Sequence, residues 1–452
     1  MTLRLHKLLF LLVAIPLCTI AQVRWERDPE FRQNLPLSYE AIPFYSADTS
    51  VALVNLHYRI SQRFFVFVKD PDDPERYLAK GELMIELRNA QDIAVAREIR
   101  QIRILRQAQP QEKEQLPDLQ GACSFKVPEG EYRVIFSLND RESGRTFLDR
   151  DKKVTTKKAD LQLLELSYPM FALLEHVEAV THKTQILPFN RGTDVTYGGR
   201  GGLVYQVYLP DDHPLQVRWK IQRQRGPLQD WFPSFSGDSY TLMNGMLTLE
   251  KWEQEVVYTV EQNAPPGWKV LYVTLPIEKL EPGGYRLEIE IASGQVKSSR
   301  QLNFQVQWLN RPASLLNAQL AIDALRHIAT EEQLSSMQTG SMERNIKAFY
   351  EFWRTKDPDT TTAYNEVLVE YYRRVDEAVS RFSTLSGQDG YKTDRGRIFI
   401  LYGAPTRVEK YIPPGEAPRE VWIYDRPNLR KKFTFIDRYK AGAFVLVSVE
   451  DL

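Results

Sequence analysis

Short runs of alternating hydrophobic and polar residues dominate the chain up to about residue 309. Between Tyr39 and Val154 these runs are rich in β-branched and aromatic residues, as in SVALVNLHYRI, RFFVFVKD and ACSFKVPEGEYRVIFSLND. The pattern continues from Leu161 to Leu309, in GGLVYQVYLP, LQVRWKIQRQ, VVYTVEQ, KVLYVTLPI and YRLEIEIAS. Many short strands with regularly spaced turns are typical of antiparallel sandwiches. The pattern therefore predicts two all-β sandwich domains of the immunoglobulin-like type.

An internal similarity supports two related domains. The segment VPEGEYRVIFSLNDRESGRTFLDR resembles LEPGGYRLEIEIASGQVKSSRQLNF further along the chain. Both contain a proline, a glycine-bearing turn, Tyr-Arg, an alternating strand, a polar turn and a further strand. We therefore expect each sandwich to end with the same kind of hairpin.

The hydrophobic period changes after Asn310-Arg311-Pro312. Spacings of three or four residues, which mark one face of a helix, recur in three segments. The first face carries Leu315, Ala318, Ile322, Leu325 and Ile328. The second follows Gly340-Ser341 and carries Met342, Ile346, Phe349 and Trp353. The third starts near Thr362 and carries Val367, Tyr371, Val375, Ala378 and Phe382.

Strand-like runs return after the third helix, in RIFILYG, EVWIYD, KKFTFID and AFVLVSV. Helices followed by a small antiparallel sheet predict an α+β domain. The expected organisation is a signal peptide, a linker, two sandwiches and this α+β domain, over residues 1–21, 22–38, 39–158, 159–310 and 311–452 respectively.

The amino terminus has the pattern of a secretory signal. Arg4 and Lys7 precede an apolar run from Leu8 to Leu17, and small residues follow, with cleavage expected after Ala21. The run is too short to span a membrane. Lipid attachment at Cys18 is not expected, because Leu17 stands where a small residue is required. We expect an exported protein, periplasmic or associated with the cell envelope, without a transmembrane helix in the mature chain.

Composition narrows the function classes. The chain has 452 residues, of which 43% are hydrophobic and 26% charged, with 59 basic and 59 acidic residues. This balance gives no sign of the basic excess typical of nucleic-acid binding. Cleavage after Ala21 would leave Cys123 as the one cysteine, so no internal disulfide is expected and Cys123 is interpreted as a small buried residue on a strand.

Most candidate chemical motifs are weak. The glycine-rich YGGRGGLVYQVY precedes a strand and lacks a Lys-Ser/Thr, so it predicts a turn rather than a phosphate loop. His176, Glu178 and His182 would share one strand face, where a metal site is conceivable but an exposed polar face is favoured. The arginines of REIRQIRILR are interpreted as a solvated face rather than a basic binding strip. No cofactor or metal is expected.

The segment DGYKTDRGRIFILYGAP, residues 389–405, concentrates polar residues ahead of an apolar run that we expect to form a strand. Thr393 and Asp394 are natural acceptors for backbone N–H groups in a turn. Either Arg395 or Arg397 would be able to pair with Asp394. Three interpretations stay open: a structural network joining helices to the sheet, a binding site, and a catalytic site, for which a lone aspartate is a thin basis.

This region resembles the GWxTD domain family of exported bacterial proteins. The name-giving residues occur as GYKTD, with Tyr391 in place of tryptophan. The segments FYEFWRTKDPDTTTAYNE, YYRRVDEAVSRF, TDRGRIFILYGAP and REVWIYD are also similar to family segments, over Ser341 to Asp425. The resemblance implies an envelope location and an α+β domain behind β-sandwiches, but no activity. The residues of interest are Gly390, Tyr391, Thr393, Asp394, Arg395, Gly396, Arg397, Tyr402, Gly403 and Trp422.

Our first hypothesis is a non-enzymatic binding or scaffold protein of the bacterial cell envelope, which docks an envelope protein or peptide through this domain. The sandwiches would act as spacers, and their edges would accept a partner strand. The alternatives are a hydrolase or peptide-processing enzyme with its site around Asp394, and a carbohydrate-binding protein that stacks sugars on aromatic residues.

Overall fold

The structure is a computed structural model that describes residues 36–111, 116–176, 184–211, 213–225, 230–251, 256–384 and 387–452. The chain divides into two compact units, and each is described by itself. The β unit consists of the described residues up to Ile277 together with Pro282–Gln307. The carboxyl-terminal unit comprises Glu278–Glu281 and Trp308–Leu452. The expected signal peptide and residues 22–35 of the expected linker lie outside the described residues.

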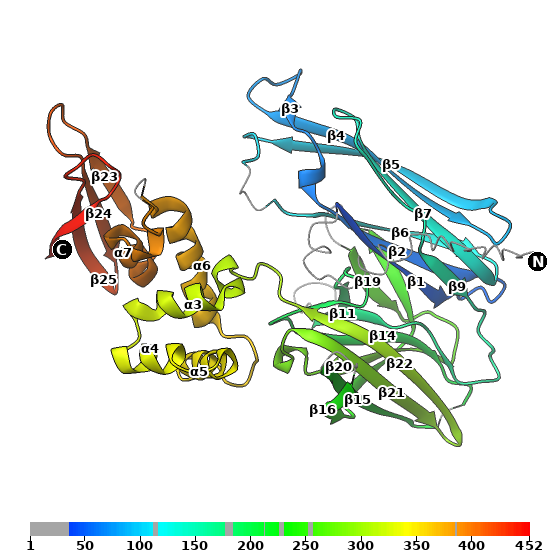
Figure 1. The fold of residues 1–452 in the computed structure, drawn as a ribbon. Coiled ribbons are helices and arrows are strands. Elements are labelled where there is room, and N and C mark those ends of the chain that lie inside the picture. The colour runs from blue at the N-terminus through cyan, green and yellow to red at the C-terminus, as the bar shows by residue number, and fades with distance from the viewer. Residues whose placement is uncertain are drawn as a thin grey trace, which may run out of the picture. The chain divides into compact units, whose positions relative to one another are not determined.

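The first part of the β unit forms two sheets (Figure 1). A three-stranded sheet has the order β1-β2-β6, and the other has the order β3-β4-β7-β8, with β5 on β4 and β9 on β7. The strands are β1 Leu37–Tyr45, β2 Ala52–Ile60, β3 Val68–Lys69, β4 Tyr77–Arg88, β5 Ala94–Arg106, β6 Leu119–Val127, β7 Gly130–Asp140, β8 Thr146–Asp149 and β9 Lys153–Thr156.

The remainder of the β unit forms an eight-stranded sheet and a five-stranded sheet. The first has the order β17-β20-β14-β11-β12-β19-β18, with β10 on β14, and the second β13-β22-β21-β15-β16. The strands are β10 Glu165–Leu166, β11 Met170–His176, β12 Thr184–Pro188, β13 Val195–Thr196, β14 Gly201–Tyr208, β15 Leu215–Arg225, β16 Asp230–Gly237, β17 Tyr240–Asn244, β18 Met246–Lys251, β19 Val256–Glu261, β20 Trp268–Leu275, β21 Gly283–Ser293 and β22 Val296–Gln307. A short 3-10 turn, η2, covers Ile277–Lys279.

The β1-β2-β6 sheet is covered on both faces. Leu56 and Tyr58 of β2 join a core with β4 and β7, whereas Ile42 and Phe44 of β1 join a core with the eight-stranded sheet. Successive side chains on a strand point to opposite faces, so this sheet is a layer shared by two cores.

A buried polar network lies between this shared layer and the eight-stranded sheet. The Tyr258 hydroxyl is 2.6 Å from Nε2 of His57 and accepts a hydrogen bond of 2.9 Å from the Asn55 amide. The Ser124 hydroxyl in turn donates to the side-chain oxygen Oδ1 of Asn55 at 2.6 Å. Burial lowers the pKa of His57 to about 3, because a charged imidazolium has no access to water there. His57 is therefore neutral at physiological pH.

Most expected strands are present, and both hairpins of the internal similarity form. β7 pairs with β8 and β21 with β22, each antiparallel. The expectation for RFFVFVKD was wrong in part: Gln62–Phe64 form a 3-10 turn, η1, and only Val68–Lys69 form a strand. The reason is the Ser61 hydroxyl, which accepts a hydrogen bond from the Arg63 amide and caps the turn. Cys123 is fully buried on β6, as expected.

The carboxyl-terminal unit contains helices followed by a four-stranded antiparallel sheet of order β23-β24-β25-β26 (Figure 1). Its α-helices are α3 Ala318–Ala324, α4 Glu331–Gln338, α5 Met342–Arg354, α6 Glu366–Phe382 and α7 Asp394–Tyr402. Its 3-10 turns are η3 Ala313–Leu316, η4 Leu325–His327 and η5 Gly390–Lys392. Its strands are β23 Arg407–Tyr411, β24 Arg419–Arg426, β25 Leu429–Ile436 and β26 Val445–Asp451. The three expected helical segments are confirmed, although the third begins at Glu366, where Asn365 caps it, and α4 was not expected.

The run RIFILYG was expected to form a strand, and this was wrong: it lies in helix α7. Thr393 caps the helix, and its side chain accepts a hydrogen bond from the Gly396 amide. Ile398, Phe399 and Ile400 are all buried, because α7 packs between α6 and the sheet. Consecutive apolar residues arise equally in a buried helix and a buried strand, so periodicity does not separate the two.

Candidate functional site

Two glycines hold the motif segment, residues 389–403, against its neighbours. A Cβ atom on Gly390 would lie 2.0 Å from the carbonyl oxygen of Ala378 in α6. A Cβ atom on Gly396 would lie 1.9 Å from the carbonyl oxygen of Gly390 itself. Neither glycine has a positive φ, so both are required by close backbone approach rather than by an unusual conformation.

Thr393 links the two halves of the segment. Its hydroxyl donates to the Gly390 carbonyl at 2.8 Å and accepts a hydrogen bond from the Gly396 amide at 3.0 Å. The same side chain therefore closes the η5 turn and caps α7. A threonine at this N-cap position stabilises a helix by roughly 1 kcal/mol relative to alanine.

Tyr391 is 3% exposed and joins the motif segment to α3. Its hydroxyl donates to Oδ2 of Asp323 at 2.6 Å, and its carbonyl oxygen lies 2.8 Å from Nε2 of His327. Partial burial tends to raise the pKa of Asp323, but the hydrogen bonds from Tyr391 and Arg326 outweigh burial and the pKa is lowered. Burial lowers the pKa of His327, which favours the neutral imidazole.

A polar hollow of about 490 Å³ opens beside Tyr391. The Nζ atom of Lys392 lies 3.0 Å from a carboxylate oxygen of Asp389 and 3.5 Å from one of Asp323. Arg326 pairs with the other carboxylate oxygen of Asp323. The hollow is lined by Asn317, Gln319, Leu320, Asp323, Arg326, Asp389, Tyr391 and Lys392. We call this the motif hollow; it offers charges of both signs and amide groups to a ligand.

The charged residues Asp394 and Arg395 contact the final sheet and do not line the motif hollow. Asp394 accepts a hydrogen bond from the Leu446 amide of β26 at 2.9 Å and pairs with Arg397 at 3.3 Å. Of the two arginines expected as partners for Asp394, the structure thus brings Arg397 to it. Arg395 points elsewhere.

Arg395 is 13% exposed in its side chain and pairs with Glu420 of β24 at 3.2 Å. It donates to the Gly442 carbonyl at 3.0 Å, and its guanidinium lies 4.1 Å from the ring centroid of Phe444. Trp422 also donates to Glu420, at 3.3 Å. These contacts bind α7 to the sheet through a buried ion pair and stacked aromatic residues.

The last motif residues complete the core. The Tyr402 ring packs against Tyr424 and Phe433. Gly403 ends α7 with a positive φ of 75°, and its carbonyl accepts from the Tyr424 hydroxyl at 2.8 Å. No atom of Tyr402, Gly403 or Trp422 lines the motif hollow.

Sequence reasoning thus singled out the motif but missed its partners. Asp323, His327 and Glu420 lie far from it in sequence, on α3, η4 and β24. One signal was available for Asp323, a charged residue inside the otherwise apolar run LAIDAL. An isolated charge on a mostly buried helix needs a partner, and here it pairs with Tyr391, Arg326 and Lys392.

The structure bears only in part on the two other candidate motifs, the possible metal site and the arginines of β5. Glu178 and His182 lie outside the described residues, as does the side chain of His176. Among the described residues, no group of three or more His, Cys, Asp or Glu side chains is placed to hold a metal ion. The arginines of β5 do not form one strip, because Arg97 and Arg103 face solvent whereas Arg100 donates to the Tyr58 hydroxyl and the Ala122 carbonyl. Within the part of the chain that is described, no helix has the length and apolar character required to cross a membrane.

Comparisons with known proteins give one informative match. No curated protein matches the chain. Among solved structures, a family 123 glycoside hydrolase from Clostridium perfringens is similar over 36% of this chain and 31% of that chain, with 10% identity and a TM-score of 0.16. A structure of manganese lipoxygenase of Gaeumannomyces graminis and zonadhesin of Komagataella pastoris is similar over 60% of this chain and 94% of that chain, with 11% identity and a TM-score of 0.13. The aligned part spans about a third of the hydrolase, and at these TM-scores neither likeness bears on fold or function.

The model of the GWxTD domain matches residues 292–448. This range contains the helices, the motif segment and nearly all of the final sheet. The chain therefore contains a GWxTD domain.

Proposed function

We propose that this chain is a non-enzymatic binding or scaffold protein of the bacterial cell envelope, which docks a protein or peptide partner through its GWxTD domain. The envelope location rests on the signal sequence expected in residues 1–21 and on the family. The β unit would contain two immunoglobulin-like sandwiches, β1–β9 and β10–β22, that act as spacers and interaction surfaces. The two hairpins, one in each half of the β unit, support this arrangement.

The observation that carries the proposal is the motif hollow. Most polar side chains of the motif form hydrogen bonds or ion pairs within the domain, as Thr393, Asp394 and Arg395 do. Lys392 pairs with Asp389 and Asp323, yet its side chain stays 34% exposed at the edge of the hollow. A rim of charges and amides around a buried tyrosine suits the polar side chains of a protein partner.

The hydrolase alternative gains no support from the site. Its proposed catalytic group, Asp394, accepts a backbone hydrogen bond from Leu446 and pairs with Arg397. A general base needs a free lone pair directed at a substrate proton, and this carboxylate is turned to the sheet. Asp394→Ala would consequently test folding more than function, so the variants belong at the motif hollow.

Site-specific photo-crosslinking in the native cells tests the proposal. A benzophenone amino acid at Gln319, on the rim of the hollow, should capture a discrete protein partner. Lys392→Glu should abolish the adduct because it reverses the charge at the rim. Lys347→Glu, the same change on the exposed surface of α5, should leave it intact. An adduct that survives Lys392→Glu, or the absence of any adduct at Gln319, would contradict the proposal.

A further inference from the structure

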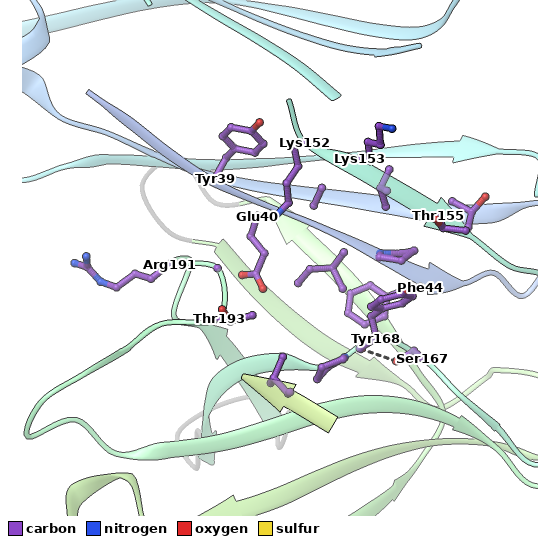
Figure 2. Close-up of a pocket in the computed structure, with 18 of the residues that line it drawn as sticks. Tyr39, Glu40, Phe44, Lys152, Lys153, Thr155, Ser167, Tyr168, Arg191 and Thr193 are labelled. Atoms are coloured by element: carbon purple, nitrogen blue, oxygen red, sulfur yellow. Dashed lines mark hydrogen bonds between the residues drawn. The ribbon is translucent and has the colours of Figure 1, made fainter. Parts of the chain in front are cut away.

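A second and larger hollow, of about 1570 Å³, lies in the β unit. All nine residues of β1, from Leu37 to Tyr45, line it, and so do all four residues of β9. Neighbouring side chains on a strand point to opposite faces. A hollow touched by every consecutive residue therefore runs along the edge of the strand and not over one face. We call it the β1 groove; Figure 2 shows β1 crossing it.

The outer edge of β1 is available for pairing. β1 is terminal in the order β1-β2-β6, and among the described residues β2 is its one paired neighbour. The Tyr45 amide donates to Oε1 of Gln206, away from β2, at 3.0 Å. Pro43 lacks a backbone N–H, and a proline is tolerated on an edge strand where that group would point away from the sheet.

These two residues fix the direction of the remaining edge groups. Backbone direction alternates along an antiparallel strand, so the N–H and C=O groups of Tyr39 and Ala41 also point outward. Among the described residues they make no backbone hydrogen bond beyond the sheet. Leu37 to Pro43 spans roughly 20 Å at about 3.4 Å per residue, enough for a peptide of about seven residues.

Glu40 supplies a side-chain recognition element in the same groove. It is 7% exposed, and Figure 2 shows its carboxyl group directed from β1 towards Arg191 and Thr193. Among the described residues this carboxyl makes no hydrogen bond or ion pair. Burial raises the pKa of Glu40 to about 8; the charge of Lys152 lowers it and that of Asp194 raises it. A buried carboxyl without a partner is costly, so a cation placed against it gains both charge pairing and hydrogen bonds.

We propose that the β1 groove binds an extended peptide segment of another protein, which adds a fourth strand to the β1-β2-β6 sheet and places a lysine or arginine side chain against Glu40. Strand addition derives affinity from backbone hydrogen bonds and specificity from side chains in adjacent pockets. A peptide residue opposite Glu40 projects from the same face of the sheet, with its Cβ about 5 Å from that of Glu40. The proposal does not depend on the motif hollow, because the two hollows share no lining residue.

Fluorescence anisotropy with short labelled peptides tests the proposal on the full mature chain. The first probe is the capped heptapeptide Thr-Val-Thr-Lys-Thr-Val-Thr, and in the second norleucine replaces lysine. A third carries N-methyl groups on alternate amides, which remove the donors of an added strand. We expect the lysine peptide to bind roughly tenfold or more tightly than the norleucine peptide, and the N-methylated peptide to lose binding.

Two variants locate the contact. Glu40→Gln should remove the preference for lysine, while Glu131→Gln, an exposed change on β7 outside the groove, should retain it. Ala41→Pro should abolish binding of all peptides, because it deletes an outward N–H and leaves the β2 ladder intact. Circular dichroism checks that each variant is folded.

The outcomes separate the proposal from its rivals. Lysine preference that persists in Glu40→Gln would remove the assigned ion pair, and binding that survives N-methylation would exclude strand addition. If the chain binds no peptide and instead dimerises in sedimentation, with dimers lost in Ala41→Pro, the occupant is a second copy and the proposal is overturned. None of these results affects the Lys392 experiment.

Discussion

Replacement of Gly390 by alanine should destabilise the carboxyl-terminal unit strongly. The added Cβ atom would lie 2.0 Å from the Ala378 carbonyl oxygen and 2.8 Å from the Ser383 nitrogen. Both neighbours are backbone atoms, at the carboxyl-terminal end of α6 and just beyond it. Because backbone atoms cannot rotate away as a side chain does, η5 must move by about 1 Å to restore a normal contact.

The cost follows from what this movement breaks. η5 carries Tyr391, whose hydroxyl is bonded to Asp323, and its Gly390 carbonyl accepts the Thr393 hydroxyl. Overpacking of a well-packed core costs about 1–3 kcal/mol, and the strained hydrogen bonds place this case at the upper end, near 3 kcal/mol. For a unit of about 150 residues, each kcal/mol lowers Tm by roughly 2–4 °C, so Tm should fall by about 6–12 °C.

Differential scanning calorimetry of the full chain measures this effect, with the β unit as an internal reference. Gly387→Ala is the matched control, because nothing lies within 4 Å of its Cβ position. Its φ of 85° is in the left-handed region, so it should cost only about 1 kcal/mol. Equal Tm values for the two variants, or a change below 2 °C for Gly390→Ala, would refute the close-packing explanation of this glycine.

Three further results are expected. Tyr391→Phe should lower the free energy of unfolding of its unit by about 1.5–3 kcal/mol in urea titrations, because the Asp323 carboxylate loses a hydrogen bond; a loss below 0.5 kcal/mol would contradict this role. Arg395→Leu should cost about 3 kcal/mol by removing the buried partner of Glu420, which then keeps only the Trp422 indole and a 3.5 Å contact with the largely exposed Lys410, and the double variant Arg395→Leu with Glu420→Leu should recover much of that loss. Finally, the pKa of His57 is lowered from 6.5 to about 3 in the fold, so its contribution to stability is present above pH 6.5 and lost as pH falls towards 3; thermal melts from pH 7 to 4 should show this loss in the wild type and a smaller one in His57→Gln.

The sequence allowed the architecture of this protein to be predicted better than its contacts. Alternation identified strands such as β7 and β21, in which buried positions alternate with more exposed ones. It failed at residues 397–403, where the buried run belongs to a helix packed on both sides. Periodicity carries no signal there, and the decisive cue was the capping geometry of Thr393.

For the candidate site, too, the sequence identified the local motif but not its distant partners. Residues 390–397 were identified as a polar corner, and the pair Asp394 and Arg397 was among those expected. The partners Asp323 and Glu420 were not found, because each is separated from its contact by many residues and local rules describe only near neighbours. Glu40 was missed for the same reason, since its burial depends on the sheets that pack around it and not on its sequence neighbours.

The motif segment combines two tasks that its sequence does not separate. From Thr393 onward its side chains cap α7 and pair with the sheet, whereas Tyr391 and Lys392 face α3 and the motif hollow. Tyr391 also explains how the segment accommodates tyrosine where the family has tryptophan. Its ring is buried like an indole, and its hydroxyl donates to Asp323, so the exchange retains both the packing and a hydrogen-bond donor. Under the proposed function, the residues from Thr393 onward hold Tyr391 and Lys392 in place beside the motif hollow.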